Sequence, residues 1–492
     1  MSTNTPVKPA PVSGFDRYFK ISERGSTLAR EVRGGFVTFF TMAYIIALNP
    51  LIIGTVKDGT GQFLGGGSAP NLAMVAACTA LVAGVMSILM GVVANFPMSI
   101  AAGLGLNAFV AFGVAALPDM TWKAAMGLVV WEGILILLLV ISGFRVAAFR
   151  ALPGQMKTAI SVGIGLFIAF IGLFDAGFSR AGAGTPVQLG IDGRLQGWPI
   201  VVFIVGFLLL LALYVRKVTG ALLIAIVSAT VLAIIIESIA KIGPRFVDGK
   251  PTNDRTWSLN VPAVPDQVVS TPDFSLVGQV DMFGGFAKIG VIAAALIIFS
   301  LILADFFDTM GTMTAIGAKG DLLDEDGAPH DTQKILVVDS VAAAAGGLGG
   351  VSSNTGYIES ASGVGDGART GLASVVTGVL FLFATFLAPL VEVIPHEAAA
   401  PALVFVGFLM MQEVGEINWR DIDIALPAFL TIALMPLTYS ITVGIGAGTL
   451  AYLLIKIIKG KWREIPVILW IISFCFFLYF AIDPIRQIFG VN

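Results

Sequence analysis

The chain has 492 residues, of which 57% are hydrophobic and only 12% are charged. Soluble domains carry about 25% charged residues, so this composition indicates a membrane protein with many spans. The net charge of −3 argues against a nucleic-acid-binding surface. The two cysteines, Cys78 and Cys475, lie in apolar runs and argue against a disulfide framework or a metal site. We therefore expect no nucleic-acid partner, no metal and no cofactor.

The first 34 residues are polar and contain no signal-peptide core, so we interpret 1–34 as a cytoplasmic N-terminal tail. Apolar runs long enough to cross about 30 Å of hydrocarbon then recur along the chain. The predicted fourteen transmembrane segments are 35–54, 71–94, 96–114, 123–143, 158–175, 198–215, 219–240, 286–316, 334–349, 352–367, 370–393, 399–413, 422–437 and 439–458. A further run, 465–482, is expected at the inner interface, with an extra span as the alternative.

Lysine and arginine residues mark the cytoplasmic ends of membrane segments. They follow the fourth, sixth, eighth and fourteenth segments, at Arg145, Arg150, Lys157, Arg216, Lys217, Lys319, Lys334, Lys456, Lys459, Lys461 and Arg463. Because all four segments are even-numbered, we predict a cytoplasmic N-terminus. The longest polar connector, 242–285, is then extracytoplasmic.

The segments divide into seven plus seven, and an odd number per half gives the two halves opposite orientations. We therefore predict inverted repeats over 35–241 and 286–460, followed by a C-terminal apolar helix within 461–492. The third segment, FPMSIAAGLGLNAFVAFG, and the tenth, SSNTGYIESASGVGDG, are short and glycine-rich. Interrupted segments at matching places in two halves indicate the central site of a transporter. Close helix packing through small residues is the alternative explanation.

Two carboxylates within the eighth segment are the strongest functional signal. A charged side chain at a bilayer centre costs about 2.5–3.5 kcal/mol on insertion scales, yet the stretch SLILADFFDTMGT contains Asp305 and Asp308. Both share one helical face with Thr309 and Thr312, at spacings of three, four and seven residues. We expect this face to line a cavity inside the protein. Capping of another helix is the structural alternative.

The two broken segments add further polar groups. Glu359 and Ser362 share a face of the tenth segment, and Asn107 lies in the third. Asp366 and Arg369, near the end of the tenth segment, are expected to form a structural cap or gate pair.

These runs contain almost no lysine or arginine, so nothing neutralises their acids. Such carboxylates take up protons readily, and the candidates for proton coupling are Asp305, Asp308 and Glu359, with sodium as the alternative cation. The expected ligand is a small, uncharged, planar heterocycle, because carboxylates accept its N–H groups. Phe109 and Tyr357 are close enough in sequence to stack on it, with simple packing as the alternative. The candidate substrate-binding residues are Asp305, Glu359, Asn107, Asp308, Thr309, Phe109, Tyr357 and Ser362.

Three motifs occur in order along the chain: FTMAYIIALNP (40–50), ADFFDTMGT (304–312) and GYIESASGVGDGARTGLASVVTG (356–378). From about Phe15 onwards the chain resembles the AzgA-like adenine/guanine/hypoxanthine permeases of the nucleobase–cation symporter-2 superfamily. Asp305, Asp308, Glu359 and Asn107 match that family's functional positions in segments 8, 10 and 3.

The resemblance implies an all-α fold of fourteen transmembrane segments in two inverted repeats. Segments 1–4 and 8–11 would form a core domain, and segments 5–7 and 12–14 a gate domain. Segments 3 and 10 would pair through short antiparallel strands. The implied activity is proton-coupled import of purine nucleobases by movement of the core against the gate. A homodimer formed through the gate domains, in a bacterial inner membrane, is also implied.

Two other functions are weighed against this one. A carrier of the same fold could move an anion, uracil or xanthine, but the acids Asp305 and Glu359 disfavour an anion. An intramembrane aspartyl protease is the remote alternative, because GVGDG (363–367) contains the string G-x-G-D. That string is a weak signal in a chain with 57 glycines.

Overall fold

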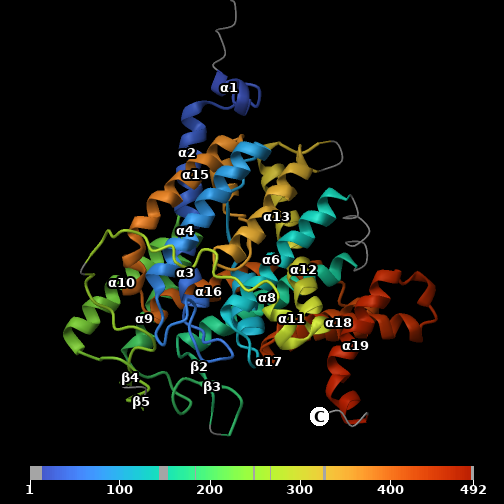
Figure 1. Cartoon of the computed structure of the whole chain (residues 1–492). Coiled ribbons are helices and arrows are strands. Elements are labelled where there is room, and N and C mark those ends of the chain that lie inside the picture. The colour runs from blue at the N-terminus through green and yellow to red at the C-terminus, as the bar shows by residue number, and fades with distance from the viewer. Residues whose placement is uncertain are drawn as a thin grey trace, which may run out of the picture.

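The computed structural model describes residues 14–142, 153–182, 184–247, 250–265, 267–324 and 328–488 (Figure 1). Part of the predicted tail (1–13), Arg145, Arg150 and the last four residues lie outside this range. The described chain is mostly helical, and ten of its helices are long and apolar enough to cross a membrane. This confirms the predicted class of helical membrane protein with many spans.

The first half of the chain forms six helices long enough to span, joined by shorter elements. In order these are α1 (Gly14–Phe19), α2 (Leu28–Met42), α3 (Ile45–Ile53), α4 (Leu72–Leu89), η1 (Met90–Ala94), β1 (Ile100–Ala102), α5 (Leu104–Ala108), η2 (Phe109–Ala115), α6 (Trp122–Ile141), α8 (Gly154–Asp175), β2 (Ser179–Arg180), β3 (Gln188–Leu189), α9 (Trp198–Val215) and α10 (Ala221–Ala240).

The second half follows after a long connector. Its elements are β4 (Phe246–Val247), β5 (Lys250–Pro251), α11 (Gly284–Ile289), α12 (Val291–Gly320), α13 (Thr332–Leu348), β6 (Asn354–Gly356), α14 (Ser360–Gly365), α15 (Gly371–Ala384), η3 (Thr385–Val393), α16 (His396–Met411), η4 (Gln412–Glu416), α17 (Ile422–Thr438), α18 (Ile441–Ile458), η5 (Trp462–Glu464) and α19 (Val467–Ile488). The eighth predicted segment is divided at Gly290, whose φ of 82° ends α11 before α12 begins.

Two short strands from opposite halves of the chain meet inside the helical bundle. β1 and β6 pair antiparallel, with Ile100 opposite Gly356 and Ala102 opposite Asn354. Each strand leads directly into a short helix, α5 or α14. The pairing satisfies backbone groups that water cannot reach at this depth, which is the condition for irregular backbone within a membrane.

Glycine lets several helix pairs approach at backbone distance. A Cβ atom added to Gly34 of α2 would lie 2.9 Å from the carbonyl oxygen of Gly363 in α14. A Cβ added to Gly347 of α13 would lie 2.8 Å from the backbone nitrogen of Val130 in α6. Such close packing through small residues is typical of membrane helices, where burial of apolar surface drives association weakly.

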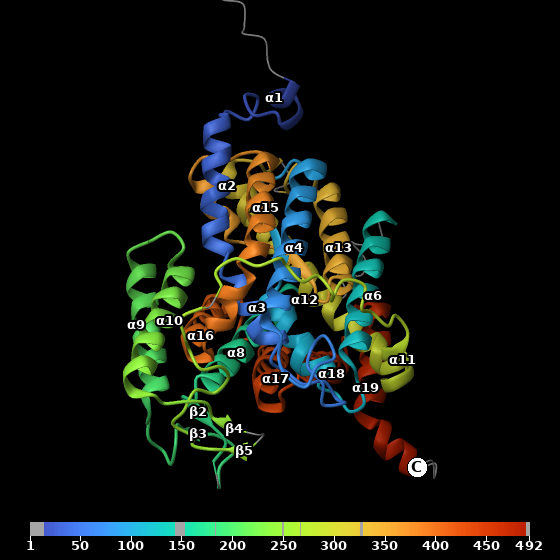
Figure 2. The same cartoon turned by 60° about the vertical axis from the view of Figure 1, so that its left-hand side comes forward.

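The helices gather in two groups, towards opposite ends of the molecule. Figures 1 and 2 show α2, α4, α13 and α15 standing together towards the end that carries α1, whereas α9, α10, α16 and α17 lie towards the opposite end. Contacting pairs include α4 with α15, α6 with α13, α8 with α16, α9 with α10 and α17 with α18.

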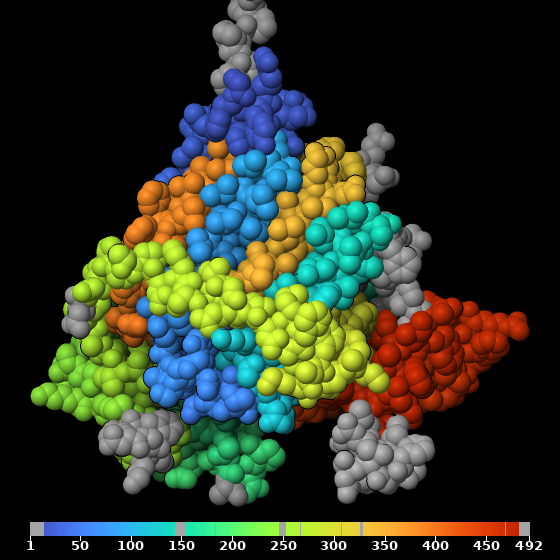
Figure 3. Space-filling view, viewed as in Figure 1, coloured from blue at the N-terminus to red at the C-terminus, as the bar shows by residue number. Residues whose placement is uncertain are grey.

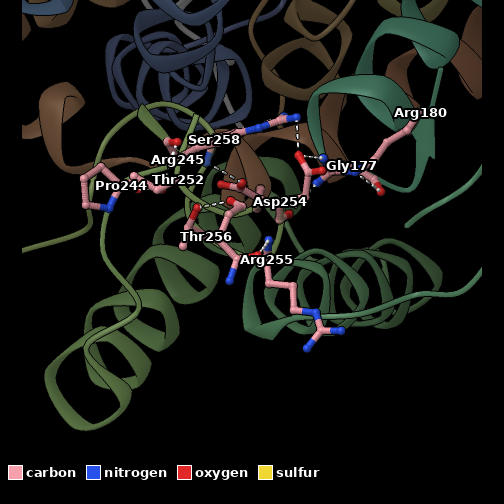
Figure 4. A network of polar contacts seen from close by, with 11 residues as sticks. Gly177, Arg180, Pro244, Arg245, Thr252, Asp254, Arg255, Thr256 and Ser258 are labelled. Carbon is pink, nitrogen blue, oxygen red and sulfur yellow. Dashed lines mark hydrogen bonds and ion pairs between the residues drawn. The ribbon is translucent and has the colours of Figure 1, made fainter. Parts of the chain in front are cut away.

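The connector between α10 and α11 crosses one face of the molecule, as the yellow-green band in Figure 3 shows. Near its start, Asp254 pairs with Arg180 at 3.2 Å and with Arg245 at 2.5 Å, which ties it to the turn after α8 (Figure 4). Burial is the main cause that lowers the pKa of the Arg180 guanidinium. Near its end, the Asp281 backbone N–H donates to the carbonyl of Lys123 at 2.9 Å.

The C-terminal apolar run forms α19, which packs against α18 and α12. Leu469, Ile472 and Phe476 are buried on one face, while Ile471 and Phe474 are about 60% exposed on another. This two-sided pattern fits either a helix at the interface or one facing lipid. The predicted choice between an interfacial helix and an extra span therefore stays a prediction.

Candidate functional site

A fully buried carboxylate lies beside the crossing of β1 and β6. Asp305 is in the middle of α12 and is 0% exposed. Neither of its carboxylate oxygens has a hydrogen-bond partner among the described residues. The hydroxyl of Thr355 in β6 approaches it, but makes its 2.7 Å hydrogen bond with Thr309 instead. A buried acid without a partner is costly, so a functional role is the expected reason for it.

Two further acids lie near Asp305. The sequence interpretation did not select either of them. Glu132 of α6 is 0% exposed and accepts a 3.1 Å hydrogen bond from Ser353 Oγ. Asp339 of α13 is 2% exposed and is approached by Thr309 and the Gly356 backbone, but its Oδ1 has no hydrogen-bond partner among the described residues. Both acids interact electrostatically with Asp305. The cost of a lone acid in an apolar span, which identified Asp305, could have identified both.

Glu359 lies at the start of α14 and is held by a residue from the first membrane helix. The hydroxyl of Tyr44, which is 1% exposed, donates a hydrogen bond to Glu359 Oε1. Glu359 is itself half-buried, and Asp308 is close enough to interact with it electrostatically. The sequence interpretation missed Tyr44, because a tyrosine in a membrane helix is not an unusual residue.

Asp308 lies on the exposed face of α12, although it is near the middle of that helix. The same face carries Gly311, Ala315 and Ala318, all exposed, and ends at Lys319. Just before α14, Ile358 is 47% exposed, and Gly365 at the end of α14 is also exposed. The open surface therefore follows small residues from the two acids towards the C-terminal end of α12.

The remaining predicted site residues lie around the same crossing but differ in accessibility. Asn107 is 0% exposed, and neither polar atom of its side chain has a partner among the described residues. Ser362 is half-buried on α14. Phe109 is fully buried, and the Tyr357 hydroxyl donates to the carbonyl of Ala102 at 2.6 Å. These bonds and packing occupy both aromatics within the protein in this structure.

Asp366 does not pair with Arg369, and the predicted cap or gate pair is wrong in this respect. Asp366 forms an ion pair with Arg33 of α2. The Arg369 guanidinium instead donates to the backbone carbonyls of Val364 and Ala368. The geometric reason is that the chain turns after α14, so that the start of α2 lies opposite Asp366.

Among the residues that the structure describes, the site therefore combines exposed and buried acids without a cationic partner. None of the described ion pairs includes Asp305, Asp308 or Glu359. Within the described ranges, no three histidine, cysteine or acidic side chains gather closely enough to hold a metal ion. The arrangement can accept hydrogen bonds from an uncharged donor at Asp308 and Glu359, and can hold protons on the acids buried behind them.

Comparison with known proteins identifies relatives over nearly the whole chain. Residues 29–447 match the model of a family described as the Permease family. The chain is 35% identical to adenine permease AdeQ of Escherichia coli (strain K12), covering 94% of this chain and 95% of that protein. It is 34% identical to guanine/hypoxanthine permease PbuG of Bacillus subtilis (strain 168), covering 94% and 98%. These matches confirm the resemblance that the three sequence motifs predicted.

A solved structure shares the fold at much lower sequence identity. The transmembrane domain of the cyanobacterial bicarbonate transporter BicA matches with a TM-score of 0.56 and 17% identity. The match covers 86% of this chain and 97% of that domain. This likeness places the chain in a transporter fold.

Proposed function

The chain belongs to the Permease family and is a membrane transporter rather than an enzyme, and we propose that it carries purine nucleobases by proton symport. AdeQ and PbuG, named for adenine and for guanine/hypoxanthine, support this class of substrate. The observation that carries the proposal is the pair Asp308 and Glu359, two accessible intramembrane acids that have no cationic partner among the described residues.

The base binds between α5, α12 and α14. Glu359 and Asp308 accept hydrogen bonds from its ring N–H or amino groups. The unpaired amide of Asn107 is able both to donate and to accept, and addresses a different edge of the base. An anionic substrate is disfavoured, because like charges placed close together in a low-dielectric site repel each other strongly.

The coupling proton resides on the acids of this site. Asp305, Asp308 and Glu359 are the candidates, and Glu132 and Asp339 extend the set behind Asp305. The helices α6, α12, α13 and α14 supply these acids. The electrostatic repulsion between the acids therefore depends on how these four helices are arranged. Loading a proton and an uncharged base lowers the net negative charge that the moving part must carry through the membrane.

Fourteen segments arranged as two inverted repeats account for which helices contact each other. Four segments add to the ten long spans: β1 with α5 and η2, α13, β6 with α14, and α17. An inverted repeat relates segment 2 to segment 9 and segment 4 to segment 11. The contacts of α4 with α15 and of α6 with α13 are then equivalent, as are those of α9 with α10 and of α17 with α18.

Transport proceeds by an elevator-type displacement of the core, segments 1–4 and 8–11, against the gate, segments 5–7 and 12–14. The displaced grouping of helices in Figures 1 and 2 supports such an arrangement. At one end, Phe112 of the core meets Tyr439 of the gate, with ring centroids 5.3 Å apart, and Tyr439 also contacts Phe167. Aromatic packing there, and exposed small residues on α12, support a state open towards the predicted cytoplasmic side.

The assembly is a homodimer formed through the gate domains in a bacterial inner membrane, with the N-terminus in the cytoplasm. The helices α9 and α10 support this choice, because their apolar windows are only 33% and 28% buried, the lowest fractions among the ten long spans. A large exposed apolar face on a gate helix is available to a second copy as well as to lipid.

The test is uptake of radiolabelled hypoxanthine by cells that lack their own purine carriers. Wild-type protein should accumulate hypoxanthine, unlabelled adenine and guanine should compete, and a proton ionophore should abolish accumulation. Glu359→Gln should lose uptake, whereas Glu392→Gln, the same change at an exposed residue of η3, should retain it. Normal uptake by Glu359→Gln, or uptake of sulfate, uracil or xanthine in place of hypoxanthine, would contradict the proposal.

A further inference from the structure

A crevice of about 350 Å³ separates two helices on the side of α2 that does not carry the contact with Glu359. It lies between α2 and the start of α10, and Figure 2 shows α2 standing beside the turn that joins α9 to α10. Its lining residues are Arg33, Phe36, Val37, Phe40, Thr219, Gly220, Leu223 and Ile224. This volume falls within the range of about 300–1,000 Å³ that is typical of ligand pockets.

The body of the crevice is apolar and open to the membrane. Phe36, Phe40 and Ile224 line it and are 42%, 51% and 40% exposed. Gly220, with φ of 75°, allows the start of α10 to approach α2: an added Cβ would lie 3.0 Å from the carbonyl oxygen of Phe40. An apolar space between two spanning helices matches the chemistry of a lipid acyl chain.

Positive charges lie at one end of this crevice. The side chain of Arg33 lines it and is 62% exposed. Arg216 and Lys217, both exposed, precede the lining residues Thr219 and Gly220 with Val218 between them. Among the described residues, Asp366 is the acid that forms an ion pair with a lining residue of the crevice, Arg33. Three cations against one acid leave a net positive charge of about two, which favours an anionic group.

We propose that the crevice between α2 and α10 binds an anionic membrane phospholipid. One acyl chain packs against Phe36, Phe40 and Leu223, and the phosphate headgroup lies among Arg33, Arg216 and Lys217. The two parts of the site, an apolar slot and a cationic rim at one end of it, match the two parts of one lipid molecule. The proposal concerns binding and stands independently of which solute the protein carries.

The experiment measures lipid retained by the purified full-length protein. The protein is reconstituted in vesicles of equimolar phosphatidylglycerol and phosphatidylcholine and then extracted. Native mass spectrometry measures which lipid, and how much of it, stays bound to the protein. Wild-type protein should retain phosphatidylglycerol in preference to phosphatidylcholine. The double variant Arg216→Gln/Lys217→Gln should bind phosphatidylglycerol about 30-fold more weakly, equivalent to about 2 kcal/mol for two cations. The matched charge control is Lys241→Gln, at the opposite end of α10.

A second pair of variants tests the acyl slot without changing charge. Leu223→Trp fills the crevice and should displace the lipid, whereas Val231→Trp, at a 50% exposed position further along α10, should not. Equal retention of the two lipids by wild type would overturn the anionic headgroup assignment. Unchanged phosphatidylglycerol binding in both the double variant and Leu223→Trp would overturn the site.

Discussion

Tyr44→Phe removes a single oxygen atom and with it the hydrogen bond that holds Glu359. Tyr44 is 1% exposed, so water has little access to replace its hydroxyl. A hydrogen bond to a charged group contributes about 1.5–3 kcal/mol. Because 1.4 kcal/mol corresponds to a tenfold change in Kd, the affinity for the base should fall about 10- to 150-fold if Glu359 needs this bond to be oriented for binding.

The assay is equilibrium binding of radiolabelled hypoxanthine to purified protein, with uptake as a second measurement. Tyr18→Phe is the matched control, because its hydroxyl donates to the carbonyl of Val92, away from the acidic site. It should bind hypoxanthine like the wild type. If Tyr44→Phe also binds hypoxanthine with unchanged Kd while remaining folded, then Glu359 either does not contact the base or does not depend on Tyr44.

Three further substitutions test other parts of the structure. Glu132→Ala leaves Ser353 Oγ unpaired and should cost about 1–3 kcal/mol of stability, seen as a lower Tm, whereas Glu132→Gln keeps an acceptor and should cost less; equal losses would contradict this role. Gly34→Ala overpacks the contact of α2 with α14 and should cost about 1–3 kcal/mol, and an unchanged Tm would show that the helices can separate. Tyr439→Ala removes the aromatic contact with Phe112, worth about 0.5–1.5 kcal/mol, and should lower the KM for external base roughly 2- to 10-fold. A raised KM would show that this contact does not hold the outer side closed.

The sequence predicted the membrane class and the central acids for the same physical reason. Asp305 and Glu359 are conspicuous because a charge in an apolar run has a large free-energy cost that only function or pairing explains. Glu132 and Asp339 also lie in apolar runs, so the same free-energy argument could have selected them. Their interaction with Asp305 depends on the three-dimensional arrangement of α6, α12 and α13, which the sequence alone does not specify.

Pairings between distant residues could not be read from the sequence. Arg33 and Asp366 are 333 residues apart and meet only because α14 packs against α2. Tyr44 and Glu359 are separated by 315 residues and come together for the same reason. Local spacing identifies residues on one face of one helix, whereas a pairing between helices depends on the tertiary arrangement.

The short strands illustrate a different limit. β1 and β6 have only three residues each, all buried, so they lack the alternation of apolar and polar residues that marks a half-buried strand. Their pairing was expected solely from the resemblance of the chain to a family. Glycine-rich composition located the breaks in the third and tenth segments but gave no register between them.

The most direct test of the account is a cryo-electron microscopy map of the full-length protein with hypoxanthine. The account predicts density for the base between α5, α12 and α14, with Glu359 and Asp308 within hydrogen-bonding distance of its N–H groups and the Asn107 amide beside it. A base bound elsewhere, with these three side chains making no contact to it, would contradict the central claim.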